Sequence, residues 1–218
     1  MTFLQAVNPG IEYKRYFEDF NAMSNGPLPY DWYVRILQGV GPEVYTNFVR
    51  AAQTNTLNSQ SRSMLVYSEP VATDDQILRV NTATAVDGLL SGLIIRSDIM
   101  MYNCLLAILS TNNNERGLYR MVDGLTTRVA TFPSAFSTGE TWGLKAEGSL
   151  VSLIRNPLWN NTGGSLVASW DDTSGLSLKG EDYRYGGMFV NSDRNAFSIR
   201  NHSAGLDNYD FRDLGWVA

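Results

Sequence analysis

A tryptophan within an asparagine-rich stretch is the first group of side chains that could bind a ligand. Trp159 follows Asn156 by three residues and directly precedes Asn160 and Asn161. A flat indole ring can stack on the face of a sugar, and side-chain amides offer the donors and acceptors that sugar hydroxyls need. We therefore predict a carbohydrate contact here. The alternatives are an aromatic packed on its own sheet and an interface residue.

Two tyrosines farther along the chain form the second part of this predicted sugar site. Tyr183 and Tyr185 lie in a stretch that is rich in glycine and polar residues. A phenol combines an apolar ring face with a hydroxyl, so it can both stack on a sugar and hydrogen-bond to it. The same two alternatives apply to these rings.

A pair of adjacent aspartates suggests where a metal could bind. Asp171 and Asp172 follow an apolar run, and Glu181, Asp182 and Asp193 lie in stretches that follow. Calcium prefers loops that are rich in carboxylate and carbonyl oxygens. A calcium site on Asp171 and Asp172 is therefore one interpretation, and a turn-forming aspartate pair is the other. No other cofactor is expected.

Carboxylate pairs could also hydrolyse a glycosidic bond, but the spacing in this chain does not favour it. A glycosidase needs two carboxyl groups that flank the scissile bond, about 5 to 5.5 Å apart in a retaining enzyme. Glu140 and Glu147 are separated by seven residues, an odd number, so on one strand they face opposite sides. Adjacent pairs such as Asp74 and Asp75 diverge in the same way. We expect no catalytic site of this kind.

Nucleophilic catalysis lacks its partners as well. The chain has one cysteine, Cys104, inside an apolar run, and one histidine, His202, far from it in sequence. A catalytic cysteine needs a histidine close by, and a serine triad needs a histidine and an acid. We expect Cys104 to be a small buried side chain, no disulfide within the chain, and a protein that is not an enzyme.

Short apolar runs separated by turns must position these residues. Residues 92–97, 103–109, 118–122, 125–130, 142–147 and 150–154 each have the composition of a β-strand. Asp123 and Gly124 separate two of the runs, and Asp-Gly is typical of a tight hairpin turn. We predict one antiparallel meander from residue 92 to residue 154, which a second layer must cover on its apolar side.

The rest of the chain continues this pattern. Further strands are predicted at residues 16–20, 31–36, 63–67, 76–80, 166–170, 186–190 and 207–218, while residues 44–50 and 196–200 remain ambiguous. No sustained helical periodicity is present. The pattern predicts an all-β fold, a two-sheet antiparallel β-sandwich, as one domain over residues 17–218. Residues 1–16 are predicted to form an extended N-terminal arm, which either docks on a neighbour or is a simple chain end.

Composition limits the classes of partner. The net charge is -5, the isoelectric point is near 4.9, and the 17 lysines and arginines are scattered. Binding to nucleic acid needs clustered basic residues, so we do not expect it. None of the apolar runs is long enough for a membrane helix, and no signal peptide is visible at the N-terminus. We expect no membrane association and a protein that is cytosolic or reaches its site by assembly.

The order of several short motifs resembles a known group of proteins. Residues 17–21, 25–28 and 31–32 are similar to the opening of bacteriophage (actinobacteriophage-type) minor tail proteins with a concanavalin A-like lectin/glucanase jelly roll. Further similarity follows in the usual order, at residues 75–76, 92–97, 118–124, 144–149, 170–173 and 186–187. The resemblance extends over residues 17–218.

This resemblance implies a concanavalin A-like jelly roll and a place in a virus particle. It implies a non-catalytic virion protein, a minor tail or tail-tip component made in the host cytoplasm, which binds host-surface glycan for attachment. Its partners would be other virion proteins and copies of itself, a trimer being one form. The alternatives are a purely structural capsid-decorating or tail-cementing protein without a ligand, and a glycan hydrolase with an atypical site.

Overall fold

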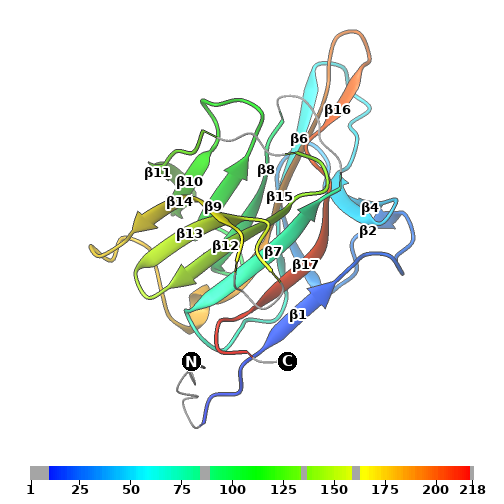
Figure 1. Ribbon diagram of the computed structural model, residues 1–218. Helices are drawn as coiled ribbons and strands as arrows, with labels where there is room; N and C mark the ends of the chain where they lie inside the picture. Colours follow the sequence, from blue (N-terminus) through cyan, green and yellow to red (C-terminus); the bar gives the residue numbers. More distant parts are fainter. Residues whose placement is uncertain (1–9, 84–88, 134–136, 159–162, 217–218) are drawn as a thin grey trace.

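The structure is a computed structural model that describes residues 10–83, 89–133, 137–158 and 163–216. These residues form an all-β sandwich of two antiparallel sheets (Figure 1), which confirms the predicted fold class. One 3₁₀ turn, η1 (Glu181–Tyr183), is the helical element of the described part. No helix in that part is long and apolar enough to cross a membrane.

The first layer, called sheet A, has nine strands. Its hydrogen-bonded order is β14 (Ser165–Asp171), β13 (Leu150–Arg155), β12 (Thr141–Glu147), β7 (Gln76–Thr82), β17 (Leu206–Asp213), β5 (Phe48–Ala51), β4 (Pro42–Tyr45) and β2 (Gly26–Pro27). The ninth strand, β1 (Arg15–Glu18), pairs with β17 beside the main path.

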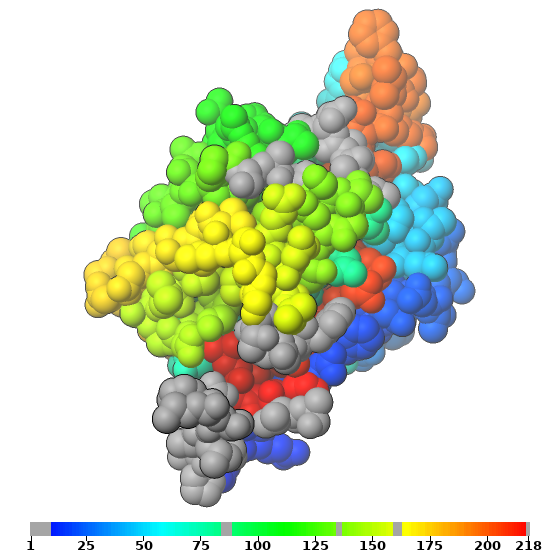
Figure 2. Space-filling view, viewed as in Figure 1, coloured from blue at the N-terminus to red at the C-terminus, as the bar shows by residue number. Residues whose placement is uncertain are grey.

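The second layer, called sheet B, has eight strands. Its order is β11 (Leu125–Ala130), β10 (Gly117–Val122), β9 (Cys104–Leu109), β8 (Ser91–Ser97), β15 (Tyr185–Arg194), β6 (Ser59–Tyr67) and β3 (Trp32–Gln38). The eighth strand, β16 (Arg200–His202), pairs with β15, and their hairpin stands out from one corner of the molecule (Figure 2).

The core lies between the two sheets. Alternation along β7 and β12 turns Leu78 and Leu144 inward from sheet A, while Leu93 and Met188 face them from sheet B. Trp142 is fully buried among them, and Phe132 packs 6.2 Å from it between ring centroids. This continuous apolar layer holds the two sheets together.

The predicted single meander is wrong in one respect: it is divided between the two sheets. Strands β8 to β11 pair in succession in sheet B, with Asp123 and Gly124 at positive φ in the predicted turn. The chain then crosses to sheet A, where β12, β13 and β14 pair in succession. Phe132 and Trp142 explain the crossing, because both rings are buried in the core between the layers.

Several ambiguous or approximate boundaries are resolved. Residues 44–50 belong to a tight β4–β5 hairpin with Thr46 and Asn47 at positive φ. Strand β6 already begins at Ser59, and the last strand ends at Asp213. Most of residues 196–200 form the tip of the β15–β16 hairpin rather than a strand. These differences are shifts of strand ends and do not alter the architecture.

The described part of the predicted arm lies along its own domain. The Lys14 N–H donates to a carboxylate oxygen of Asp213 at 2.8 Å, and Tyr13 packs against Gly215. The Tyr16 ring lies 4.8 Å from that of Tyr67, between centroids. Residues 1–9 lie outside the described residues, so an arm that docks on a neighbour stays a prediction.

Candidate functional site

The outer face of sheet B carries a second apolar cluster, separate from the core. In β9, Leu105 and Ala107 point into the core, so Leu106 and Ile108 point outward. Met64 from β6 and Phe189 from β15 extend the same outer surface. The sequence of β9, Cys-Leu-Leu-Ala-Ile-Leu, lacks polar alternation, which is the pattern of a strand that is covered on both faces.

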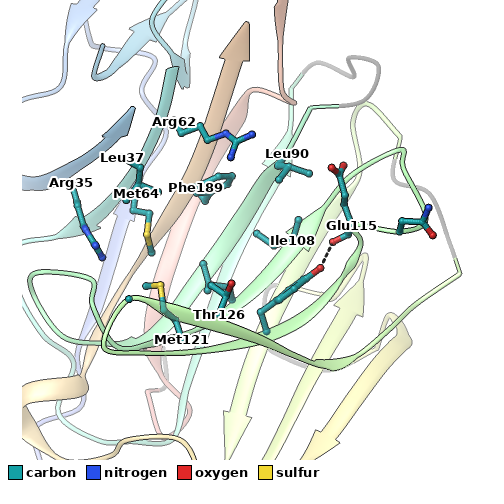
Figure 3. Close-up of a pocket in the computed structure, with 14 residues that line it drawn as sticks. Arg35, Leu37, Arg62, Met64, Leu90, Ile108, Glu115, Met121, Thr126 and Phe189 are labelled. Carbon is teal, nitrogen blue, oxygen red and sulfur yellow. Dashed lines mark hydrogen bonds between the residues drawn. The ribbon is translucent and has the colours of Figure 1, made fainter. Parts of the chain in front are cut away.

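A groove lies over this cluster and encloses about 360 Å³. Met64, Phe189 and Ile108 form its floor, between Arg35 at one end and Glu115 at the other (Figure 3). This size lies within the range of small-ligand sites, which are mostly apolar with a few polar groups that orient the ligand. The groove is therefore the candidate binding site.

Hydrogen bonds fix the wall at the Arg35 end. Arg35 donates to the carbonyl oxygen of Met101 at 2.5 Å and stacks over the Tyr102 ring, 3.8 Å from its centroid. The N–H of Gly124 donates to the Tyr102 carbonyl at 2.8 Å, which ties the β10–β11 turn to the same wall. The Arg35 guanidinium is thus used for structure.

The wall at the Glu115 end is formed by the turn between β9 and β10. The Tyr119 hydroxyl donates to the backbone carbonyl of Glu115 at 2.7 Å, and the Ser110 hydroxyl donates to its carboxylate at 3.3 Å. Arg128 of β11 donates to the carbonyl of Asn114 at 2.7 Å. These bonds hold the turn against the sheet, so the groove has a defined width.

The residues predicted to bind sugar do not come together in the described structure. Trp159, Asn160 and Asn161 lie outside the described residues. The side-chain oxygen of Asn156 accepts a hydrogen bond from the Thr141 N–H at 3.0 Å, at the start of β12. The adjoining Leu158 carbonyl accepts from Arg79 at 2.5 Å, so residues 156–158 lie along sheet A.

The tyrosine half of that predicted site lies on the other layer. Tyr185 packs against the outer apolar cluster of sheet B, and Tyr183 ends the turn η1. Burial, followed by the negative charge of Glu69, raises the pKa of the Tyr185 hydroxyl. Tyr185 and Asn156 are thus on opposite layers of the sandwich, and the sugar site over residues 156–164 stays a prediction.

Asp171 and Asp172 occupy different environments at the end of β14. Asp171 is exposed and accepts a hydrogen bond from Ser149 at 2.7 Å. Asp172 is buried, and its carboxylate accepts from the backbone N–H groups of Leu176 and Ser177 and from the Ser177 hydroxyl. Burial alone would raise the pKa of Asp172, but these hydrogen bonds outweigh it and lower the pKa.

The other acids named with this pair are dispersed. Glu181 and Asp182 belong to η1, and Asp193 accepts a hydrogen bond from Asn201 at 2.7 Å on the projecting hairpin. Within residues 10–83, 89–133, 137–158 and 163–216, no group of three or more His, Cys, Asp or Glu side chains could hold a metal ion. Calcium binding by Asp171 and Asp172 stays a prediction.

The other side chains that could take part in catalysis are paired with neighbours or buried. Glu140 pairs with Arg155 before β12, and Glu147 pairs with Lys145 at the far end of that strand. Cys104 is buried on the outer side of sheet B, and burial raises the pKa of its thiol well above the ordinary value. His202 contacts Gln53 through its Nε2 atom at 2.5 Å.

Comparison with known proteins bears on the fold. No protein-family model matches the sequence, and neither does any curated protein. Among solved structures, the exoplasmic/lumenal domain of VIP36 in its Ca²⁺/Man-bound form is similar, with a TM-score of 0.58 and 11% identity over 95% of this chain and 93% of that chain. The winged bean acidic lectin complexed with methyl-α-D-galactose has a TM-score of 0.53 and 8% identity over 92% and 98%.

At these identities the likeness establishes the fold alone. The chain has the concanavalin A-like jelly roll of lectins, as its motifs implied. A sequence signal for the groove was present in the unbroken apolar run of β9, which requires cover on both faces. No local motif marks the groove itself, because its lining comes from strands that are distant in sequence.

Proposed function

We propose that this chain is a carbohydrate-binding protein whose ligand lies in the groove on the outer face of sheet B. The observation that carries the proposal is the groove itself, an apolar hollow of about 360 Å³ with polar walls on a lectin-like sandwich. Rigid walls reduce the ordering cost when a ligand binds. Many copies on one surface would raise a weak single-site affinity through multivalency.

We propose binding without catalysis. Glu115 is the one carboxylate among the described residues that line the groove, whereas glycoside hydrolysis normally uses two. A hydrolase with an atypical site is the second candidate. A reducing-end assay on host cell-wall polysaccharide separates the two, because a binding protein releases no new ends.

A blocking variant tests the location of the site. Thr126 lines the groove opposite Met121, so the Thr126→Trp indole fills it. Thr127, the next residue of β11, points to the other side of the sheet and provides the control Thr127→Trp. On a glycan array with multivalent protein, Thr126→Trp should lose binding and Thr127→Trp should retain it. Equal binding by both variants would show that the groove is not the binding site.

We also propose that the protein is a virion component, a minor tail or tail-tip protein that attaches to host glycan. Support comes from the ordered motifs, such as residues 17–21 and 25–28, that resemble phage tail modules. Mass spectrometry of purified particles would detect the chain if this is correct. A capsid-decorating or tail-cementing protein is the structural alternative, and it is favoured if multivalent protein binds no glycan.

The edge strand β3 supports the proposal of a homo-oligomer. It pairs only with β6 among the described strands, and Tyr33, Ile36 and Leu37 are 47%, 54% and 44% exposed. An exposed apolar edge offers unpaired backbone groups to another strand, here β3 of a second copy. Sedimentation should give a multimer that Ile36→Lys dissociates. A monomeric wild-type protein would contradict this.

A further inference from the structure

The lining of the groove includes a cation that the fold does not use. Arg62 of β6 lines the groove, and Figure 3 shows its guanidinium beside Phe189 and pointing toward Leu90. Its Nε atom is buried and has no hydrogen-bond partner among the described residues. None of the ion pairs formed by those residues includes Arg62.

A second unpaired polar group adjoins it. Asn191 of β15 lies directly opposite Arg62 in the strand register, on the same side of the sheet as Phe189. Asn191 is 1% exposed, and its side-chain oxygen lacks a partner within the part of the chain that the structure describes. Buried polar atoms normally find partners, so an unpaired donor atom of Arg62 in the groove lining, with an unpaired acceptor atom on the neighbouring strand, indicates a ligand.

The other charges of the groove are already used. Arg35 is bound to the Met101 carbonyl and the Tyr102 ring. Glu115 lies at the opposite end of the groove from Arg35 (Figure 3) and accepts a hydrogen bond from Ser110. A ligand in the groove would therefore find one available cation, Arg62, beside an apolar floor.

We propose that Arg62, with Asn191 beside it, forms a subsite for an anionic ligand, and that the groove binds an acidic sugar that carries an acyl or similar apolar group. This inference rests on the proposed function and names its ligand class. A carboxylate accepts two parallel hydrogen bonds from a guanidinium. The unpaired Asn191 side-chain oxygen is an acceptor, so it would take a hydrogen bond from a hydroxyl or N–H of the same ligand. The methyl of an acyl group would lie on Met64, Phe189 and Ile108, where a neutral, fully hydroxylated sugar would leave its hydroxyls unpaired.

A matched set of sugars tests the ligand class by calorimetry. N-acetylmuramic acid carries an N-acetyl group and a carboxylate, its methyl ester lacks the charge, and N-acetylglucosamine lacks the whole acidic side chain. We expect N-acetylmuramic acid to bind at least tenfold more tightly than either neutral sugar, as for other hydrogen bonds to charged groups. Equal affinity for the acid and its ester would overturn the anion subsite.

Variants assign the effect to Arg62 and its neighbour. Arg62→Gln should lose the tenfold preference for the acid and keep any weak binding of the ester. Asn191→Asp places a carboxylate beside Arg62, which neutralises it from within, so it should lose the same preference. Lys145→Gln is the control, because it removes one positive charge from the outer face of sheet A. A preference that survives both Arg62→Gln and Asn191→Asp would refute the assignment.

The outcomes separate this inference from the proposed function. If neutral sugars bind in the groove and Thr126→Trp blocks them, the function stands and the anion subsite fails. If no sugar binds and an acidic peptide does, both fail. If the acid binds, and Arg62→Gln and Asn191→Asp abolish its advantage while Lys145→Gln keeps it, both are supported.

Discussion

The two outer faces of the sandwich are built in opposite ways. On sheet A, Arg79 and Asp210 form a buried ion pair, Arg15 adds a second bond to Asp210 at 2.7 Å, and the carbonyl of Leu158 binds Arg79. On sheet B, the corresponding surface is an apolar floor with Arg62 unpaired at its edge. The chain thus fills one face with paired charges, and it leaves the other hollow.

Under the proposed function, the face of sheet A serves stability and the face of sheet B serves binding. A buried charge is tolerated only where partners replace its hydration, and Arg79 has such partners. Burial lowers the pKa of Arg79, and the negative charge of Asp210 opposes that shift. Arg62 has no such arrangement, so its position is explained by a ligand better than by folding.

The largest effect should come from breaking the charged network of sheet A. Asp210→Ala removes the anion between two guanidinium groups and leaves Arg79 buried without its carboxylate. We expect a loss of about 3–5 kcal/mol in the free energy of unfolding. Urea denaturation measures it. The control Glu147→Ala, which breaks a half-exposed pair with Lys145, should cost roughly 0–1 kcal/mol.

If the Asp210 variant lost no more stability than this control, the network would not be a stabilising feature. The outer face of sheet A would then have no special part in stability. Sugar affinity of the folded Asp210 variant should stay unchanged, because the groove lies on the other layer.

A smaller loss should follow truncation of the groove floor. Phe189 packs on one side against the outer cluster and faces the groove on the other, whereas Phe211 is fully buried in the core. We expect about 2 kcal/mol for Phe189→Ala and about 3–5 kcal/mol for Phe211→Ala, because only the core site leaves a closed cavity. Thermal and urea unfolding of the pair measure the difference. Equal costs would mean that the groove is closed in solution.

Alkaline pH should weaken the sheet A side by a still smaller amount. Burial, and then the charges of Glu69, Tyr67 and Asp213, raise the pKa of Tyr16 to about 12. A raised pKa means that the folded state favours the protonated phenol, so its stabilisation is complete below pH 10 and disappears as pH rises toward 12.

We expect a loss of about 1 kcal/mol from Tyr16 over that range, after allowance for its partial exposure to solvent. Urea unfolding at pH 9 and pH 11.5 measures it, with Tyr16→Phe as the control that removes this component. If the variant and the wild type lost stability in parallel, the titration of Tyr16 would not contribute.

The smallest effect on protein stability should follow replacement of Arg62, the cation in the groove. Arg62→Met removes an unpaired guanidinium, so the free energy of unfolding should stay the same or rise by about 0.5 kcal/mol. The equivalent change on the other face, Arg79→Met, should cost about 3 kcal/mol, because it strands Asp210. A loss of more than roughly 1.5 kcal/mol for Arg62→Met would mark Arg62 as a structural residue.

Local chemistry explains what the sequence predicts well. The Asp123-Gly124 turn was predictable because both residues tolerate positive φ, and they adopt it. The two-layer fold follows from short apolar runs without helical periodicity. The sequence does not predict the crossing from sheet B to sheet A after β11. The sheet that a strand joins depends on its packing against distant strands, which local sequence does not show.

The candidate site was less predictable because it is assembled from distant segments. Arg62 and Asn191 are neighbours only through the register of β6 and β15, and no spacing within the chain reveals it. Residue type alone does pick out side chains that can stack on a sugar, such as Tyr185, which packs against the outer apolar cluster of sheet B. The unbroken apolar sequence of β9 implies that both faces of this strand are covered, but it does not show what covers the outer face.

Methionine-methyl NMR during titration with N-acetylmuramic acid tests the central claim most directly. Met64 and Met121 line the groove, while Met188 is buried in the core and Met23 lies elsewhere. We expect the Met64 and Met121 methyl signals to shift with saturation, and those of Met188 and Met23 to stay in place. Saturable shifts at Met23 with Met64 and Met121 unchanged would contradict a ligand site on the outer face of sheet B.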